Sequence, residues 1–264
     1  MLKCCSLYSG SSGNSFFIQS DNTKILIDAG VSCKKIETAL KNDFNLNLND
    51  IDAIFVTHEH IDHTKGLNLI SSKYDLPVYA SSGTWAALKD KTEKISAKNK
   101  KIIQLDKSFE FKDLRIFPFS TYHDAVEPCG FNIYNNNSKV SIATDLGHID
   151  DRILNNLKNS SFIMLESNYE PNILKISSYP YNLKRRILGE QGHLSNSEAG
   201  ETISKLINHG LKDALLIHLS KENNVPEIAY ETVVEKLKNE NCNLDSINLN
   251  VAPRNSSSKI FNII

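Results

Sequence analysis

The feature that most constrains this chain is an apolar strand that ends in a cluster of metal-ligand side chains, Phe-Val-Thr-His-Glu-His-Ile-Asp-His at residues 55–63. The run from Ile51 to Thr57 predicts a buried strand. His58 and His60 stand two positions apart, so in an extended chain their side chains face the same way. An aspartate and a third histidine follow, where we expect the chain to turn into a helix. Three imidazoles and a carboxylate within six positions suit zinc, manganese or iron, so the segment predicts a metal centre at a strand end.

The remainder of the chain predicts two β-sheets with outer helices. Its 264 residues contain no repeat and no linker rich in Pro, Gly or Ser, which suits a single domain over residues 1–264. Strand and helix patterns alternate in the first half, short strands dominate from Ile102 to Thr144, and the alternation returns after Asp150. Further strands are expected at residues 3–9, 16–20, 24–28, 77–81, 162–167, 214–218, 247–251 and 259–263, and a helix at 32–41. We therefore expect two sheets packed face to face and covered by helices.

Charge and cysteine usage limit the class of protein. Lys and Arg number 30 against 31 Asp and Glu, so any binding of nucleic acid must come from a local patch. Basic clusters occur at residues 34–35, 98–101 and 184–186, and clusters of this kind are more often solvated faces than binding sites. The five cysteines are an odd number without framework spacing, the opening residues lack the apolar run of a secretory signal, and no stretch is apolar enough to span a membrane. We expect a reduced, cytoplasmic protein.

The His-x-His-x-Asp-His pattern resembles the signature of the metallo-β-lactamase superfamily, and the other superfamily positions are matched in order. They are Asp28 in Leu-Ile-Asp-Ala-Gly, His123 in Tyr-His-Asp-Ala, Asp145 in Ile-Ala-Thr-Asp-Leu-Gly and His218 in Leu-Leu-Ile-His-Leu-Ser. The resemblance implies an α+β fold, the four-layer αβ/βα sandwich, and two divalent ions, Zn²⁺ or Mn²⁺. It assigns one ion to His58, His60 and His123, the other to Asp62, His63 and His218, and Asp145 to both.

Some acidic and histidine residues near these motifs leave alternatives open. Asp28 is as well explained by a role in orienting a ligand histidine, or the loop beneath it, as by ligation. Asp124 beside His123 is either an extra ligand or a structural residue. His148 and His209 match no motif, and we interpret them as surface residues.

A narrower resemblance covers the whole chain and points to the YycJ/WalJ-type exonucleases of the same fold. It rests on five segments: Ser-Gly-Ser-Ser-Gly-Asn-Ser at 9–15, His-Asp-Ala-x-Glu-Pro at 123–128, Glu-Ser-Asn-Tyr at 166–169, Gly-His-Leu-Ser-Asn at 192–196 and His-Leu-Ser-Lys-Glu-Asn-Asn at 218–224. The resemblance implies 5′-to-3′ degradation of nucleic acid, with DNA favoured over RNA and manganese as the activator.

Motif spacing argues for a compact nuclease. Only 21 residues lie between His123 and Asp145, too few for the arm with which the similar tRNA 3′-end endonucleases grip their substrate. The 72 residues between Asp145 and His218 are too few for the large inserted domain of related RNA- and DNA-processing nucleases. We therefore expect the compact core alone.

Two loops are candidates for substrate binding. The first, residues 9–15, could offer backbone N–H groups and hydroxyls to a phosphate through Ser12, Gly13 and Asn14, although such loops are often only turns. The second, residues 192–196, precedes a helix that we expect to continue to residue 207, whose N-terminus favours anions. There Ser195 and Asn196 are candidate contacts, and Ser195 with Glu198 also forms a capping-box pattern.

His193, in the second loop, resembles the histidine that superfamily phosphodiesterases place over the scissile phosphate, the alternative being an exposed residue of a capping loop. A hydroxide held between two ions would attack phosphorus, with Asp62 orienting it and His193 steadying the phosphate or protonating the leaving oxygen. One alternative is a hydrolase of small thioesters, lactones or β-lactams on the same ion pair. Another is a non-catalytic metal-binding or regulatory protein.

Overall fold

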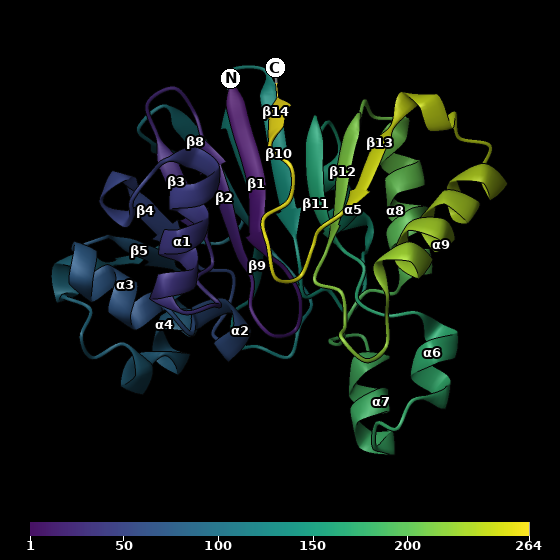
Figure 1. The fold of residues 1–264 in the computed structure, drawn as a ribbon, viewed down its shortest axis with the longest axis horizontal. Helices are drawn as coiled ribbons and strands as arrows, with labels where there is room; N and C mark the ends of the chain where they lie inside the picture. The colour runs from purple at the N-terminus through teal and green to yellow at the C-terminus, as the bar shows by residue number, and fades with distance from the viewer. Residues whose placement is uncertain (264) are drawn as a thin grey trace.

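The computed structural model describes residues 1–263 as two seven-stranded sheets packed face to face, with helices on both outer faces (Figure 1). The first sheet has the order β14-β1-β2-β3-β4-β5-β6 and the second the order β13-β12-β11-β10-β9-β8-β7. The first comprises β1 Leu2–Tyr8, β2 Ser15–Gln19, β3 Lys24–Ile27, β4 Ala53–Phe55, β5 Val78–Ala80, β6 Lys100–Ile102 and β14 Phe261–Ile263. The second comprises β7 Phe109–Phe111, β8 Leu114–Ser120, β9 Cys129–Asn135, β10 Ser138–Ala143, β11 Phe162–Glu166, β12 Asp213–Ile217 and β13 Asn248–Val251.

Three apolar clusters hold these layers together. The central cluster lies between the sheets and joins Phe55 of the first to Phe131 and Phe162 of the second. The outer face of the first sheet packs against helices α1 Cys33–Phe44, α3 Leu67–Tyr74 and α4 Ser82–Ala87, and that of the second against α5 Asp151–Leu157, α8 Asn196–Ile207 and α9 Pro226–Asn239. The short helix α2 Ile61–Thr64 lies between β4 and α3 in the chain. The predicted four-layer sandwich is confirmed. No helix within residues 1–263 has the length and apolar character needed to cross a membrane.

The expected elements differ from the structure mainly at their ends. The strand expected over residues 51–57 is shorter, since β4 covers only Ala53–Phe55 before the chain leaves the sheet. The helix expected to stop at Lys41 continues to Phe44. The next residue, Asn45, caps it with a left-handed φ of 54°. The capping box of α8 is present as predicted.

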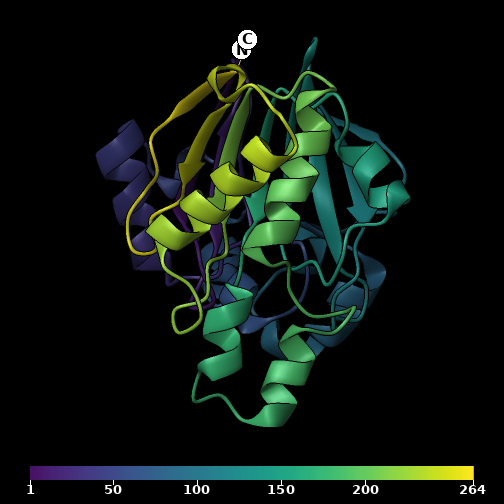
Figure 2. The same cartoon turned by 90° about the vertical axis from the view of Figure 1, so that its right-hand side faces the viewer.

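The prediction of a compact core alone is wrong at one place. Helices α6 Pro171–Ile176 and α7 Tyr181–Ile187 form an arm that projects beyond the ends of the strands (Figures 1 and 2). The arm has its own small core of Tyr169, Leu174 and Ile187. A two-helix arm of this kind fits within the interval between Asp145 and His218, which is too short for a whole inserted domain.

The strand ends of both sheets bring the ligand-type residues together. Strands β3 and β4 run parallel, as do β10, β11 and β12, so their carboxyl ends lie at one edge of each sheet. Three residues within two positions of the ends of these strands, Asp28, Asp145 and His218, have left-handed φ values of 63°, 55° and 58°. Non-glycine residues pay a steric penalty there, and such strained positions cluster at functional sites. The backbone thus turns sharply at the points where these side chains leave the sheets.

Candidate metal centre

The first group of candidate ligands consists of His58, His60 and His123, whose ligand atoms lie within 4.8 Å of one another. His123 Nδ1 donates to the Gly192 carbonyl at 3.0 Å, so its Nε2 is left with a lone pair that faces His60 Nδ1 at 3.3 Å. His58 Nε2 is buried and has no hydrogen-bond partner among residues 1–263. Buried polar atoms nearly always have a partner, so this nitrogen is an atom to which a cation would bind.

The second group consists of Asp62, His63 and His218, which also meet within 4.8 Å. Asp62 Oδ2 lies 3.3 Å from His218 Nε2 and 3.5 Å from His63 Nε2. Burial raises the pKa of Asp62, but the two histidines more than reverse this and hold it well below its ordinary value. The carboxylate is therefore ionised, as a metal ligand must be.

Asp145 lies between the two groups. Its Oδ2 is 3.1 Å from His63 Nε2, and its Oδ1 is 3.5 Å from His123 Nε2. The two oxygens of one buried carboxylate thus face different ligand groups. Imidazole nitrogens and carboxylate oxygens that converge at one place are a donor set that fits two adjacent divalent cations.

Comparison with known protein families shows to which family this chain belongs. The model of the family described as "Beta-lactamase superfamily domain" matches residues 23–219, which include every candidate ligand named above. The chain belongs to the beta-lactamase superfamily.

Relatives within this superfamily cover nearly the whole chain. The protein named "Exodeoxyribonuclease YycJ" of Bacillus anthracis is 39% identical over 232 residues, 88% of each chain. The one named "Exodeoxyribonuclease WalJ" of Streptococcus pneumoniae is 38% identical over 233 residues, 88% of this chain and 86% of that one. Among solved structures, the metallo-beta-lactamase fold protein YhfI from Bacillus subtilis aligns with a TM-score of 0.71 at 17% identity over 97% of this chain and 98% of its own. Human tRNase Z, short form, aligns at 0.64 and 15% identity over the same shares. These two structures share the fold.

Behind the ligands of this superfamily member, Asp28 orients one imidazole. The fully buried carboxylate accepts from His63 Nδ1 at 2.7 Å and from both the N–H and the hydroxyl of Thr57 at 2.8 Å. His63 therefore presents Nε2 to the centre. Of the two roles open to Asp28 from the sequence, the contacts place it behind the ligand shell.

Glu166, to which the sequence assigned no role, joins two histidines on different elements. It is the last residue of β11 and is fully buried. Its Oε1 accepts from His193 Nδ1 and from His218 Nδ1, each at 2.8 Å, and its Oε2 accepts from the N–H groups of Leu146 at 2.7 Å and Leu194 at 3.1 Å. Each ring therefore turns its Nε2 away from Glu166, and that of His218 lies 3.3 Å from Asp62 Oδ2. The available signal was an acidic residue at the end of an otherwise apolar strand.

His193 lies at the centre but outside both ligand groups. Its ring centroid is 5.2 Å from that of His123 and 5.3 Å from that of His218. Together with Asp145, Glu166 and His218 it forms a further cluster of ligand-type atoms, but Glu166 already occupies the Nδ1 atoms of both histidines. Its backbone N–H donates to the Ile187 carbonyl at 3.0 Å, so the end of α7 fixes its position.

The first predicted substrate loop lies against the candidate ligands. Ser9 accepts from the N–H of His218 at 2.7 Å, and Asn14 Nδ2 lies 3.1 Å from His63 Nε2. Gly13 donates its N–H to Gly10 at 2.9 Å and has a φ of 154°, where a Cβ would lie 2.4 Å from Val31. Contact of Gly13 and Asn14 with a substrate stays a prediction, and in the structure the polar groups of both residues bind within the protein. Ser12 remains exposed.

Two residues of the second predicted loop also bind within the protein. The Ser195 hydroxyl caps α8, accepting from the N–H of Glu198 and donating to its carboxylate at 2.6 Å. Asn196 is fully buried, accepts from the Ser167 hydroxyl and exchanges hydrogen bonds with Asn224. Contact of either side chain with a substrate stays a prediction.

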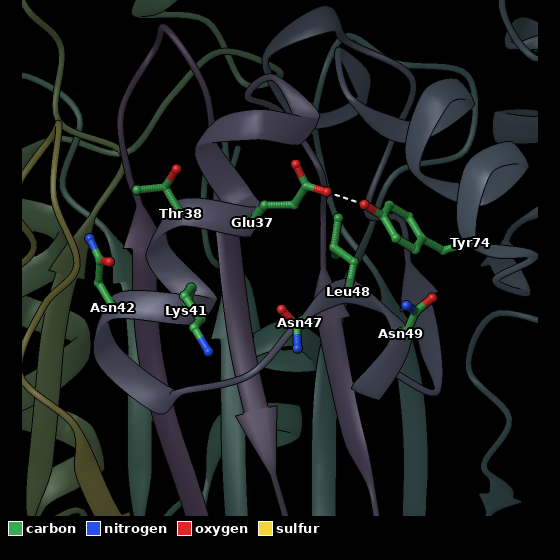
Figure 3. A pocket seen from close by; sticks show the side chains of 8 residues that line it. All are labelled: Glu37, Thr38, Lys41, Asn42, Asn47, Leu48, Asn49 and Tyr74. Atoms are coloured by element: carbon green, nitrogen blue, oxygen red, sulfur yellow. Dashed lines mark hydrogen bonds between the residues drawn. The ribbon is translucent and has the colours of Figure 1, made fainter.

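Asp124, His148 and His209, which also lie near the motifs, belong to neither ligand group. Asp124 binds the Arg186 guanidinium with both oxygens, while its Oδ1 is 3.3 Å from His123 Nε2. His148 stacks on Tyr122 with ring centroids 4.2 Å apart, and His209 is exposed. A cavity of about 410 Å³ beside α1 contains the hydrogen-bonded pair Glu37 and Tyr74 (Figure 3) and no predicted site residue.

Proposed function

We propose that this protein is a metal-dependent phosphodiester hydrolase that degrades a nucleic-acid strand from its 5′ end, with DNA favoured over RNA. The observation that carries the proposal is Asp145, whose two oxygens face two separate ligand groups in a chain 38–39% identical to relatives named as exodeoxyribonucleases. Two metal ions held by one carboxylate are suited to in-line displacement at phosphorus.

Two divalent ions, zinc or manganese, would complete this centre. One would be held by His58, His60 and His123 and the other by Asp62, His63 and His218, with Asp145 shared. When bound, such ions polarise phosphate oxygens and lower the pKa of water. The unsatisfied His58 Nε2 and the ionised Asp62 support this arrangement.

The chain's own residues position the reactants. Asp62 Oδ2, at the centre of the second group, accepts a hydrogen bond from the attacking water and orients it toward phosphorus. The water oxygen forms a bond to phosphorus and gives up a proton to solvent, while the bond between phosphorus and the leaving 3′ oxygen breaks and that oxygen takes up a proton. His193 presents Nε2 to this oxygen or to the phosphate, because Glu166 holds its Nδ1. Ser12 is the one predicted loop contact that remains exposed to a substrate.

The rival reading, a hydrolase of small thioesters, lactones or β-lactams, is not favoured by the relatives at 38–39% identity. Purified protein with added manganese or zinc should degrade linear plasmid DNA and a 5′-labelled duplex but leave nitrocefin intact. Hydrolysis of nitrocefin without nuclease activity would favour the rival. Failure to hydrolyse bis-p-nitrophenyl phosphate with either metal would favour a non-catalytic protein. A cytoplasmic location stays a prediction from cysteine usage.

A further inference from the structure

The α6–α7 arm is a basic element in a chain of nearly balanced charge. Residues 171–189 contain four basic side chains and no acidic one, whereas the whole chain carries a net charge of -1. Two of the four cations are used within the protein. Lys184 Nζ donates to the Lys175 and Ser177 carbonyls at 2.8 and 2.7 Å, which closes the arm, and Arg186 binds Asp124. Lys175 and Arg185 form no pair with an acidic group among residues 1–263.

The arm is joined directly to the metal centre. Arg186 reaches from α7 to Asp124, the neighbour of candidate ligand His123. The Ile187 carbonyl accepts from the N–H of His193 at 3.0 Å, and the Gly192 carbonyl that follows accepts from His123. A strand held by the arm would therefore pass beside the residues proposed to act on it.

The arm also exposes the two least buried large apolar side chains of residues 1–263. Ile176 is 85% exposed at the end of α6, and Tyr181 is 73% exposed at the start of α7. The Arg185 guanidinium lies 6.0 Å from the Tyr181 ring centroid. A base can stack on the exposed ring, and a phosphate can pair with the unpaired cation beside it. Proteins commonly bind single strands by combining these two contacts.

We propose that the α6–α7 arm binds single-stranded nucleic acid and guides it to the metal centre, with Tyr181 stacking on a base and Arg185 and Lys175 neutralising phosphates. The proposal deepens and rests on the proposed function. A single strand fits better than a duplex, because only unpaired bases leave a face free for an aromatic side chain. The basic cluster at residues 98–101 is a weaker candidate, since Lys98 is paired with Asp75 at 2.6 Å.

The test compares Tyr181→Ala/Arg185→Ala with Tyr230→Ala/Lys238→Ala, which removes an exposed ring and a cation from α9. Binding is measured with a phosphorothioate oligodeoxynucleotide, which resists cleavage, and turnover with the native oligonucleotide and with bis-p-nitrophenyl phosphate. The arm variant should bind the strand about ten- to a hundredfold more weakly, the loss expected for one stacked base. Arg185→Ala alone should reduce the salt dependence of binding by about 0.7 in the log–log slope. Hydrolysis of bis-p-nitrophenyl phosphate should be unchanged.

Equal binding of the strand by the arm variant, the α9 variant and the unchanged protein would overturn the arm proposal. An unchanged protein that binds the strand through the arm but never cleaves the native oligonucleotide would instead overturn the proposed function. The same loss of binding with RNA of identical sequence would support the arm as a strand-binding element that does not select the sugar.

Discussion

Glu166 and His193 are joined by a hydrogen bond of 2.8 Å between Oε1 and Nδ1, although they stand 27 positions apart in the chain. The same oxygen holds Nδ1 of the candidate ligand His218 at 2.8 Å. One buried carboxylate therefore sets the orientation of a candidate ligand just after β12 and of the proposed proton donor in the loop before α8. Any reading of the chemistry of this centre has to include Glu166.

Glu166→Gln tests this dual role. Glutamine keeps the size of the side chain, but its NH₂ group then faces either the two imidazole Nδ1–H donors or the N–H groups of Leu146 and Leu194. We expect turnover on DNA to fall about 10–100-fold, as for other groups that orient metal ligands, with weaker metal binding. Glu201→Gln, an exposed residue paired with Lys205, is the control and should be fully active. Normal turnover and metal content in Glu166→Gln would contradict the role.

His193→Ala separates proton transfer from metal binding. Because His193 lies outside both ligand groups, its loss should leave metal content and thermal stability unchanged while lowering turnover on DNA by roughly 10²–10⁴-fold. Bis-p-nitrophenyl phosphate has a good leaving group, so the defect should shrink on it if His193 acts as an acid and persist if it grips the phosphate. Full activity on DNA would remove the residue from the mechanism, and loss of one metal equivalent would make it a ligand.

Metal binding should release protons and weaken in acid. Burial lowers the pKa of His218, but Asp145, Asp62 and Glu166 outweigh it and raise this pKa to about 10 in the metal-free protein. Carboxylates likewise raise the pKa of His63 well above its ordinary value. Both rings are therefore protonated at neutral pH and must lose a proton to bind a cation, so apparent affinity should rise with pH. Calorimetric titration with zinc in buffers of different ionisation enthalpy measures this release. Heats that do not depend on the buffer would contradict it.

Local sequence predicted the parts of this site that are close together in the chain. The ligands at residues 58–63 share one strand end, and the two-sheet fold followed from the alternation of strand and helix. The partners of Glu166 and the Asp124–Arg186 pair depend on how β11, β12 and α7 pack, which periodicity does not encode. The contacts of Asn196 could not be predicted for the same reason. Its position at the start of a helix is typical of an anion site, but its amide is buried and bonded to the amide of Asn224.

The central claim is that Asp145 is shared by two metal ions that cleave a nucleic-acid strand. It is tested by measuring bound metal and digestion of a 5′-labelled duplex for the unchanged protein, His60→Ala and Asp145→Ala. Neither residue belongs to the three apolar clusters that hold the layers together, so we expect both variants to stay folded, which circular dichroism checks.

The unchanged protein should hold about two metal equivalents and release labelled mononucleotide from the 5′ end. His60→Ala should lose metal from one group, and Asp145→Ala should lose more, because its carboxylate faces both groups. Neither variant should digest the duplex. Unchanged metal content and unchanged digestion in Asp145→Ala would contradict the account.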